Sequence, residues 1–525
     1  MSNQQKTPRL IMVGVGVLMV AAAVMTGWVT RHGVGFPADA VDYTSAARTF
    51  AAHRVLQVPD NQGGLEPLSH YPPLYSLMLG AAGQMNGDVL AVARWVDLVL
   101  FPLNVLLLAW LAHRMGIMTG AVLVVCALFT LAPDILLAHV SVRSETLALT
   151  GWLTGLLLLL EWSRRKTWGW LMAAAAMASL VMLTRYVGAA LILAGALFVF
   201  FYSTGGGTRK IGHGISYLLI AVFPTLAWMV THPSSRGAAD RQFGFYGLTN
   251  YQYGKFFGAF ARWMLPFNGH SVEKAIYIGL LLVLLAMFVA LLSRGGGRVS
   301  MLWAVQFSDR VALVLLLLNL AAYEAVVFLS GIFLDPVQDV SSRMQILPFV
   351  FVLLLLGVAA SALAQNREIQ WTGCLRRLAV SLVALLVGGY VCGAATWLRG
   401  ADQEELGDNN AGIRQSAAIA LLRGRYGSVP VYTNYSGRIY YFTGRTDFYL
   451  TPFPRLKARN DPNLGFAAEQ AKMLADLVTR HGVIIYFKDT IPKMSTAEEM
   501  EETPSLKILA DFPDAVILVA TSDGK

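Results

Sequence analysis

The sequence has 525 residues, of which 56% are apolar and only 14% are charged, and its formal net charge is +9. Soluble domains usually contain about 25% charged residues, and a single soluble core stops growing beyond roughly 250–300 residues. Together with a mean hydropathy of +0.54, these values exclude a disordered chain, a coiled coil and a typical soluble enzyme. They predict an integral membrane protein, much of whose surface contacts lipid.

Long apolar segments follow one another through the first 398 residues. A helix needs about 20 apolar residues to cross a bilayer, and eleven segments approach or reach that length. They lie at residues 10–29, 89–111, 117–137, 145–162, 168–184, 186–202, 212–232, 274–292, 311–330, 344–364 and 379–398. Only Thr184-Arg185-Tyr186 separates the fifth from the sixth, so residues 168–202 form either one broken helix or two helices.

The basic residues predict the orientation in the membrane. If the N-terminus lies in the cytoplasm, every cytoplasmic loop is basic, as the positive-inside rule requires. These loops contain Arg114, Arg164, Arg165, Lys166, Arg209, Lys210, Arg294, Arg298, Arg367, Arg376 and Arg377. Much of the positive charge is thus explained by topology, and no nucleic-acid partner is expected. We predict a multi-pass protein of the inner (plasma) membrane, with a cytoplasmic N-terminus and the C-terminal domain outside.

The C-terminal part of the chain loses the long apolar runs and gains charge. Helical patterns alternate there with short apolar strands. The helices are expected at 409–424 and 464–480, and the strands at 429–432, 483–486, 506–511 and 515–520. The predicted fold class is therefore a polytopic α-helical membrane domain of about eleven spans, residues 1–398, followed by an extracytoplasmic α/β domain, residues 399–525.

The longest outer loop, residues 30–88, begins with two acidic residues. Asp39 follows the first span closely, and from Asp42 onward the pattern becomes helical, with Tyr43 on the apolar side. Either acid could be a simple helix N-cap. Alternatively, a carboxylate at the face of the membrane can accept a proton from a hydroxyl or an amine.

The same loop continues to His70 and Tyr71, which directly precede Pro72 and Pro73. Two prolines fix an extended entry into the apolar run that follows, and this run suits an interfacial helix. The simpler interpretation is a helix start flanked by aromatic residues, with His70 as a structural or surface histidine.

Arginines on the outer side oppose the positive-inside rule and therefore need an explanation. Arg143 and Glu145 lie in the second outer loop, Arg185 lies between two apolar segments, and Arg343 opens another. Such charges can simply extend toward water, or they can line a cavity and bind an anion such as phosphate. Three polar residues inside predicted spans fit hydrogen bonding between helices instead: Asp97, Asn104 and Glu324.

Taken together, these segments resemble the GT-C superfamily of integral-membrane glycosyltransferases. The resemblance is to the protein O-mannosyltransferase and aminoarabinose-transferase (ArnT-like) type, and it covers most of the chain. The Asp-x-x-x-Tyr motif of the family is met by Asp39 and Tyr43, and its second-loop acid by Glu145. Its arginine before a Leu/Pro-rich span is met by Arg343 and Pro348.

The chain departs from the family pattern at two places. Ala40 stands where the family often has a second carboxylate, which leaves Asp42 as the nearby acid. His70 and Tyr71 stand where several relatives place a phosphate-binding lysine. These departures bear on which acid acts as the base and on which residues contact phosphate.

The resemblance implies a glycosyltransferase that moves a hexosyl or pentosyl group from a polyprenyl-phosphate carrier. The acceptor is a protein, lipid or glycan at the outer face, and the implied reaction is an inverting single displacement. Asp39 and Asp42 are the implied catalytic residues. The implied substrate-binding residues are Tyr43, His70, Tyr71, Arg143, Glu145, Arg185 and Arg343.

Some expectations remain open at this point. Asp39 and Glu145 could hold a divalent cation, Mg²⁺ or Mn²⁺, although no cofactor is certain. The expected partners are the polyprenyl-phosphate-linked sugar donor, membrane lipids and an acceptor that the sequence does not identify. The alternative functions are a secondary transporter, a polymerase or ligase of polyprenyl-linked glycans, and a structural or sensor role for the outer domain.

Overall fold

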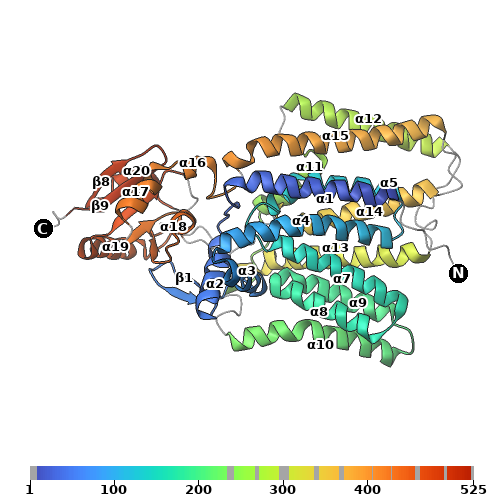
Figure 1. Cartoon of the computed structure of the whole chain (residues 1–525), viewed down its shortest axis with the longest axis horizontal. Coiled ribbons are helices and arrows are strands. Elements are labelled where there is room, and N and C mark those ends of the chain that lie inside the picture. The colour runs from blue at the N-terminus through green and yellow to red at the C-terminus, as the bar shows by residue number, and fades with distance from the viewer. Residues whose placement is uncertain are drawn as a thin grey trace.

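The protein consists of a long helical bundle with a small sheet-containing domain at one end (Figure 1). The computed structural model describes residues 9–232, 242–266, 271–294, 307–335, 342–365, 372–404, 406–426, 429–455, 462–489 and 494–521. Helix α1 begins at Arg9, at the end of the bundle farthest from the C-terminal domain. Two arginines of the predicted cytoplasmic loops, Arg298 and Arg367, lie outside the described residues.

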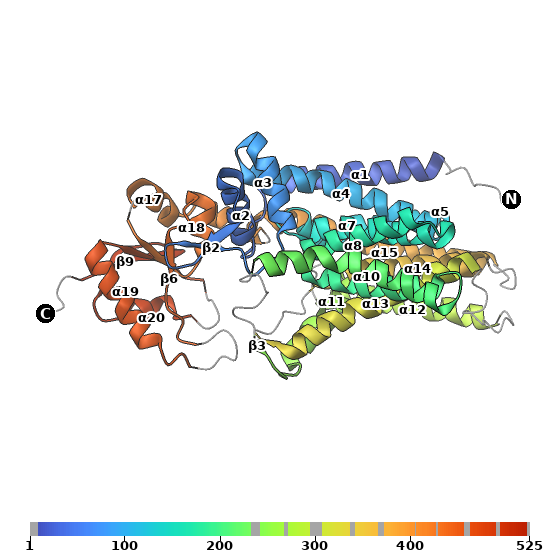
Figure 2. The ribbon, with the colours of Figure 1, turned by 90° about the horizontal axis from the view of Figure 1, so that it is seen from below.

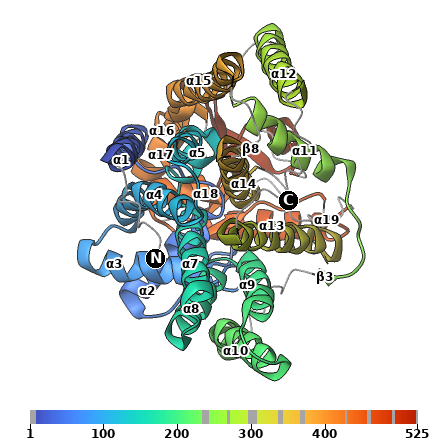
Figure 3. The same ribbon diagram turned by 90° about the vertical axis from the view of Figure 1, so that its right-hand side faces the viewer.

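Helices occupy all eleven ranges in which the hydropathy predicts spans. They are α1 (Arg9–Val29), α4 (Val89–Arg114), α5 (Thr119–Leu131) with α6 (Pro133–Ala138), α7 (Glu145–Arg165), α8 (Trp168–Thr184), α9 (Ala189–Tyr202), α10 (Gly207–Thr231), α12 (Ser271–Arg294), α13 (Phe307–Phe333), α14 (Ile346–Gln365) and α15 (Gly373–Glu404). Among the described residues, seven helices are long and apolar enough to cross a membrane. A view along the bundle shows α10 and α12 at its periphery (Figure 3).

Two breaks in the apolar runs have clear local causes. The segment 117–137 divides into α5 and α6 because Pro133 begins a new helix after the extended residue Ala132. The segment 168–202 folds as two antiparallel helices, because the chain reverses at Arg185 and the 3₁₀ turn η2 (Tyr186–Gly188). Accordingly Lys166, just before α8, donates a hydrogen bond of 2.5 Å to the carbonyl of Tyr202 at the end of α9.

The predicted first outer loop, residues 30–88, forms an ordered layer between the bundle and the C-terminal domain (Figure 2). It contains α2 (Ala40–His53), the hairpin of β1 (Gln57–Pro59) and β2 (Leu65–Pro67), and α3 (Leu74–Asn86). The loop between α10 and α12 contains β3 (Gln242–Phe243), which pairs with β4 (Leu334–Asp335), and α11 (Asn250–Met264).

The C-terminal domain is a five-stranded mixed sheet with helices on both faces. Its elements are α16 (Ala411–Arg414), α17 (Ala417–Arg425), β5 (Val431–Thr433), α18 (Ser436–Thr443), β6 (Phe448–Leu450), α19 (Phe466–Arg480), β7 (Val483–Phe487), α20 (Ala497–Glu501), β8 (Leu506–Asp511) and β9 (Ala515–Ala520). The strand order is β6-β5-β7-β9-β8, and β5 runs parallel to both β6 and β7.

Alternate side chains of the strands build two separate cores in this domain. Val431 and Ile485 face α17 and α18, and this core continues into α2 and α3. Tyr432 and Ile484 face α19 and α20. The predicted strands are present, but the predicted helix 409–424 is two helices, because Ser416 caps α17. The short elements α18, β6 and α20 were not predicted.

Backbone hydrogen bonds attach the C-terminal domain to the beginning of the first outer loop. The amide of Gly35 donates to the carbonyl of Val140 at 2.7 Å, and the amide of Phe36 donates to the carbonyl of Leu406 at 2.8 Å. The Arg48 guanidinium lies 4.7 Å from the ring centre of Tyr440. The segment just before Asp39 is therefore held on one side by the second outer loop and on the other by the linker to the C-terminal domain.

The tight reversal between α8 and α9 depends on Gly188. A methyl group at this position would lie 2.6 Å from the backbone nitrogen of Met182. We therefore expect Gly188→Ala to lower the free energy of unfolding by about 1–3 kcal/mol through overpacking. The control is Gly169→Ala in α8, where a methyl group meets nothing within 4 Å and should stabilise the helix by about 0.5–1 kcal/mol. Thermal unfolding of the purified protein in detergent measures both, and equal effects would contradict the hairpin.

Candidate functional site

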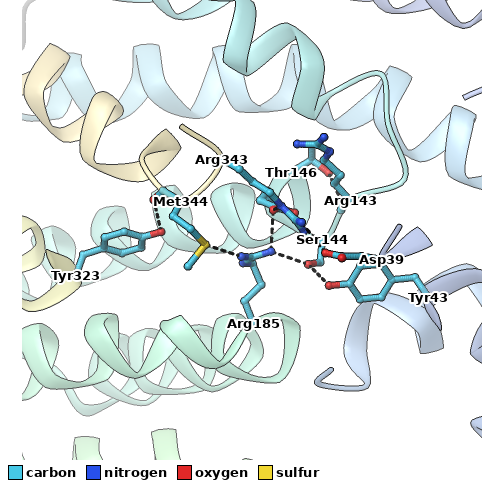
Figure 4. A network of polar contacts seen from close by, with 10 residues as sticks. Asp39, Tyr43, Arg143, Ser144, Thr146, Arg185, Tyr323, Arg343 and Met344 are labelled. Atoms are coloured by element: carbon cyan, nitrogen blue, oxygen red, sulfur yellow. Dashed lines mark hydrogen bonds and ion pairs between the residues drawn. The ribbon is translucent and has the colours of Figure 1, made fainter. Parts of the chain in front are cut away.

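Acidic and basic side chains from four separate segments meet at the end of the bundle that faces the C-terminal domain (Figure 4). Arg343 Nη1 lies 2.6 Å from Asp39 Oδ2, and its Nε pairs with Glu145 Oε1. Arg185 Nη1 lies 2.9 Å from the same Glu145 oxygen. The structure thus brings together four of the residues that the sequence singles out, and we call Asp39, Glu145, Arg185 and Arg343 the ion-pair cluster.

Each member of the ion-pair cluster lies at an end or a break of a helix. Asp39 occupies the N-cap position of α2, but its side chain makes no capping hydrogen bond. Glu145 is the first residue of α7, Arg185 separates α8 from η2, and Arg343 lies in the turn before α14. The interpretation of Asp39 as a simple N-cap is therefore wrong, because its carboxylate pairs with Arg343 instead.

Three residues that the sequence analysis missed complete the cluster. The hydroxyl groups of Tyr43 and Ser144 share a hydrogen bond of 2.9 Å, and Arg185 Nη1 donates to Ser144 Oγ at 3.2 Å. Arg185 Nη2 also contacts Met344 Sδ at 3.4 Å, and the Tyr323 hydroxyl donates to the Met344 carbonyl at 2.6 Å. A signal existed for Ser144, which lies between Arg143 and Glu145, and for Tyr323, which lies next to Glu324 in an apolar span.

Arg143 lies partly buried beside this cluster and forms no ion pair with a carboxylate among the described residues. Its Nε has no hydrogen-bond partner among the described residues, and Figure 4 shows its guanidinium pointing away from Tyr43. Burial lowers the pKa of Arg143. For Arg185 and Arg343 burial acts in the same direction, but the charge of Glu145 outweighs it and raises the pKa of both groups. Glu145 and Asp39 act on Arg143 only through space, without a direct ion pair, so its guanidinium is suited to bind an anion.

The two acids considered for a metal ion are already engaged with a guanidinium. Arg343 lies between Asp39 and Glu145 and pairs with both. Glu145 Oε2 is buried and has no hydrogen-bond partner in the described part of the chain. No group of three or more His, Cys, Asp or Glu side chains with metal-binding geometry occurs among the described residues. As arranged, this donor set does not fit a divalent cation, which prefers six or more oxygen ligands.

The remaining predicted residues lie around the cluster at different distances. The Tyr71 ring lies 4.7 Å from that of Tyr43, and burial followed by the charge of Asp39 and a hydrogen bond to Asp39 raise the pKa of Tyr71. His70 is exposed and touches the edge of the Tyr71 ring at 4.6 Å. Asp42 lies in the first turn of α2, where its charge acts on Tyr71 and on Tyr440 of the C-terminal domain. Tyr71 therefore belongs to the site, and His70 lies at its edge.

The polar residues inside the spans behave largely as expected. Asn104 of α4 donates to His139 Nε2 at 3.0 Å and accepts from Thr150 of α7 at 2.7 Å. Asp97 of α4 accepts a hydrogen bond of 3.2 Å from Thr146 of α7. Glu324 of α13 interacts with the Gln345 side chain just before α14, although neither of its oxygens makes a hydrogen bond of standard geometry among the described residues.

The structure resembles solved membrane proteins, although no family model and no curated protein sequence matches the chain. The crystal structure of ArnT from Cupriavidus metallidurans bound to undecaprenyl phosphate is 13% identical, with a TM-score of 0.57 over 99% of both chains. The oligosaccharyltransferase AglB from Archaeoglobus fulgidus, in complex with an inhibitory peptide and a dolichol-phosphate, is 13% identical. Its TM-score is 0.54, over 90% of this chain and 69% of AglB. The arabinofuranosyltransferase AftD from mycobacteria is also 13% identical, with a TM-score of 0.51 over 97% of this chain and 40% of AftD.

All three of these proteins are glycosyltransferases of the GT-C superfamily. This chain has the GT-C fold. The predicted fold class, a polytopic helical membrane domain followed by a C-terminal α/β domain, is confirmed. At such low identity the likeness shows the GT-C fold alone, so the activity has to be argued from the chemistry of the site.

Removing the shared guanidinium should destabilise the protein strongly. In Arg343→Ala the Asp39 carboxylate loses its ion-pair partner beside the buried Glu145, which keeps only Arg185, and breaking such a buried pair costs about 3–5 kcal/mol. The matched control is Arg165→Ala at the other end of α7, where an exposed arginine lies 3.2 Å from Glu161 and contributes about 1 kcal/mol or less. Chemical unfolding in detergent measures the difference. A loss of the same size in both variants would show that the cluster is not a stabilising centre.

Proposed function

We propose that the protein is a glycosyltransferase that moves a hexosyl or pentosyl group from a polyprenyl-phosphate carrier to an acceptor at the outer face of the plasma membrane. The observation that carries this proposal is the meeting of Asp39 and Glu145 with three partly buried arginines at one end of an apolar bundle. The GT-C fold supports it, and two proteins with that fold were solved with undecaprenyl phosphate or dolichol-phosphate.

The arginines suit the phosphate of the carrier. Three guanidinium groups face the two carboxylates of the ion-pair cluster, so one positive charge remains for a ligand. The phosphate would lie between Arg143 and Arg185, while the isoprenoid tail follows the apolar surface of the helices. Charge builds on the phosphate as its bond to the sugar breaks, and fixed guanidinium groups stabilise that charge.

Asp39 is suited to activate the acceptor. Its carboxylate would accept the proton of an acceptor hydroxyl or amine as the oxygen or nitrogen attacks the anomeric carbon. In the same step the bond between that carbon and the phosphate oxygen breaks, and the carrier leaves as polyprenyl phosphate. This single displacement inverts the anomeric centre, and the phosphate needs no acid to leave. Arg343 orients Asp39, and Asp42 in the first turn of α2 is the alternative base.

The distribution of basic residues supports an outer location for this site. Arg114, Arg164 and Arg165 gather around Glu161 at the other end of α7 from Glu145. The positive-inside rule assigns that basic end to the cytoplasm, which leaves the ion-pair cluster and the C-terminal domain outside. A secondary transporter would hold its substrate near the bilayer midplane, so a site at one end favours the enzyme. A polymerase or ligase of polyprenyl-linked glycans would use the same kind of site and differ in the glycan that is transferred and in the acceptor.

Replacing the base should abolish transfer while carrier binding remains. For Asp39→Asn we expect the release of undecaprenyl phosphate from undecaprenyl-phosphate sugars to fall by about 10²–10⁴-fold. This product is common to every acceptor, so a membrane extract can supply the acceptor. Asp88→Asn in the same loop is the control, because asparagine still caps α4. Loss of activity in Asp42→Asn, with Asp39→Asn active, would transfer the role of base to Asp42.

Removal of metal ions tests the role of Arg343. Because its guanidinium occupies the place between Asp39 and Glu145, we expect EDTA to leave the rate of carrier release unchanged. Added Mg²⁺ or Mn²⁺ should not raise the rate. Loss of activity in EDTA with recovery in Mn²⁺ would mean that a cation displaces the guanidinium from the two carboxylates.

A further inference from the structure

A partly enclosed cavity of about 220 Å³ lies next to the ion-pair cluster. Its walls come from α6, α11, α14 and α15 and from the turn that precedes α14. The polar and aromatic side chains that line it and are at least partly exposed are Asp134, Arg262, Trp263, Ser342 and Thr396. Pockets for drug-sized ligands measure about 300–1,000 Å³, so this cavity suits a smaller group.

One negative and one positive side chain are the charged groups among the described residues that line the cavity. Asp134 is the second residue of α6, and Arg262 lies in the last turn of α11. Their closest atoms, Asp134 Oδ2 and Arg262 Nε, are 3.8 Å apart, which is too far for a hydrogen bond. The Asp134 side chain is 25% exposed and that of Arg262 is 53% exposed. Each ion therefore has room for a further group of opposite charge, and Asp134 is the deeper of the two.

Aromatic side chains supply much of the remaining lining. Trp263 of α11 is partly exposed, whereas Tyr390 and Trp397 of α15 are buried. The Tyr390 hydroxyl donates to the Trp263 carbonyl at 2.9 Å, and the Trp263 ring lies 5.3 Å from that of Phe349. These contacts hold the indole in place before a ligand arrives, which lowers the cost of binding. Because an indole ring attracts cations over its face, Trp263 can add to the attraction of Asp134 for a positive group.

The helices around the cavity indicate that its ligand comes from the membrane. Helix α12 lies along α15 at the edge of the bundle (Figure 1), and Tyr277 of α12 packs against Gly389 of α15. Ile276, Leu280 and Val391 of these two helices are each about half exposed, and such an apolar surface on a bundle of spans contacts acyl chains. The cavity lies where α15 approaches the C-terminal domain, beyond this apolar surface. A lipid whose chains cover the surface would have its head group at the cavity.

We infer that this cavity binds the head group of a zwitterionic, amine-bearing phospholipid such as phosphatidylethanolamine. The ammonium group would donate hydrogen bonds to Asp134 beside the Trp263 ring, and the phosphate would accept hydrogen bonds from Arg262. The depths of the two side chains match the order of the head group. Its amine is at the tip and meets the deeper Asp134, whereas its phosphate is closer to the acyl chains and meets the more exposed Arg262.

The same charges disfavour other head groups. Phosphatidylglycerol carries a phosphate without a cation, so its head group would be repelled by Asp134 and would gain nothing in return. Phosphatidylcholine is zwitterionic, but its ammonium group has no N–H to donate to the carboxylate. The inference does not depend on the proposed reaction, because this lipid is neither the donor nor the acceptor.

A bound head group would also influence the ion-pair cluster. Ser342 interacts with Asp134 and directly precedes Arg343 in the turn before α14. A head group held by Asp134 would therefore restrict the movement of the turn that positions Arg343.

The test compares two lipids that differ only in the head group, with the full-length protein freed of lipid in detergent. Native mass spectrometry measures the affinities for dioleoyl phosphatidylethanolamine and dioleoyl phosphatidylglycerol. Asp134→Asn removes the negative charge with little change in shape, and Trp263→Leu removes the indole. The matched controls are Asp88→Asn, where asparagine still caps α4, and Trp95→Leu on the exposed side of α4.

The unaltered protein should bind phosphatidylethanolamine about tenfold more tightly than phosphatidylglycerol. Asp134→Asn should abolish this preference by weakening phosphatidylethanolamine binding about tenfold, the effect expected for one hydrogen bond to a charged group. Trp263→Leu should weaken the same binding by a smaller factor, and both controls should keep the preference.

Three results would overturn the inference. The first is an unaltered protein without preference, and the second is an Asp134→Asn variant that keeps it. The third is equal binding of phosphatidylethanolamine by Trp263→Leu and Trp95→Leu, a comparison that holds even where Asp134→Asn does not fold. Displacement of the lipid by an equal concentration of free O-phosphoethanolamine would assign the cavity to a soluble zwitterion and so overturn the lipid as its ligand.

Discussion

The pairing of one guanidinium with two carboxylates holds together the end of this bundle that faces the C-terminal domain. Arg343 comes from the turn before α14, whereas Asp39 and Glu145 come from the first and second outer loops. Charges at this depth are stable only when they are paired, so the three segments have to meet for any one of them to be placed there. The position of the proposed base therefore follows from electrostatic pairing and does not depend on the packing of α2 alone.

The C-terminal domain strengthens the same arrangement from the other side. Gly35 and Phe36, just before Asp39, bind the second outer loop and the linker through their backbone groups. The core that joins β5, β7, α17 and α18 continues into α2 and α3. A base that acts on an acceptor needs a fixed position relative to the donor. In the proposed reaction, the C-terminal domain would contribute by fixing the position of α2, and with it Asp39, relative to the bundle, without touching the substrate.

The sequence predicts this fold well in the membrane-spanning segments, where the lipid environment requires long, uninterrupted apolar runs. Every backbone group in lipid has to be paired within a helix, so the spans appear as long apolar runs, and the outer arginines are conspicuous because they oppose the positive-inside rule. The turn at Arg185 has no such signal, since one arginine between two apolar runs fits a broken helix equally well. The attachment through Gly35 and Phe36 was also hidden, because any residue type can supply backbone hydrogen bonds. The partners of Arg343 depend on tertiary contacts that no spacing reveals.

A structure of the protein with undecaprenyl phosphate tests the central claim, that this cluster binds the carrier phosphate and presents Asp39 to the acceptor. The account predicts that the phosphate lies within hydrogen-bonding distance of both Arg143 and Arg185. Asp39 should remain paired with Arg343 on the opposite side of the space for the sugar. A phosphate bound elsewhere, with Arg143 still without a partner, would contradict the account.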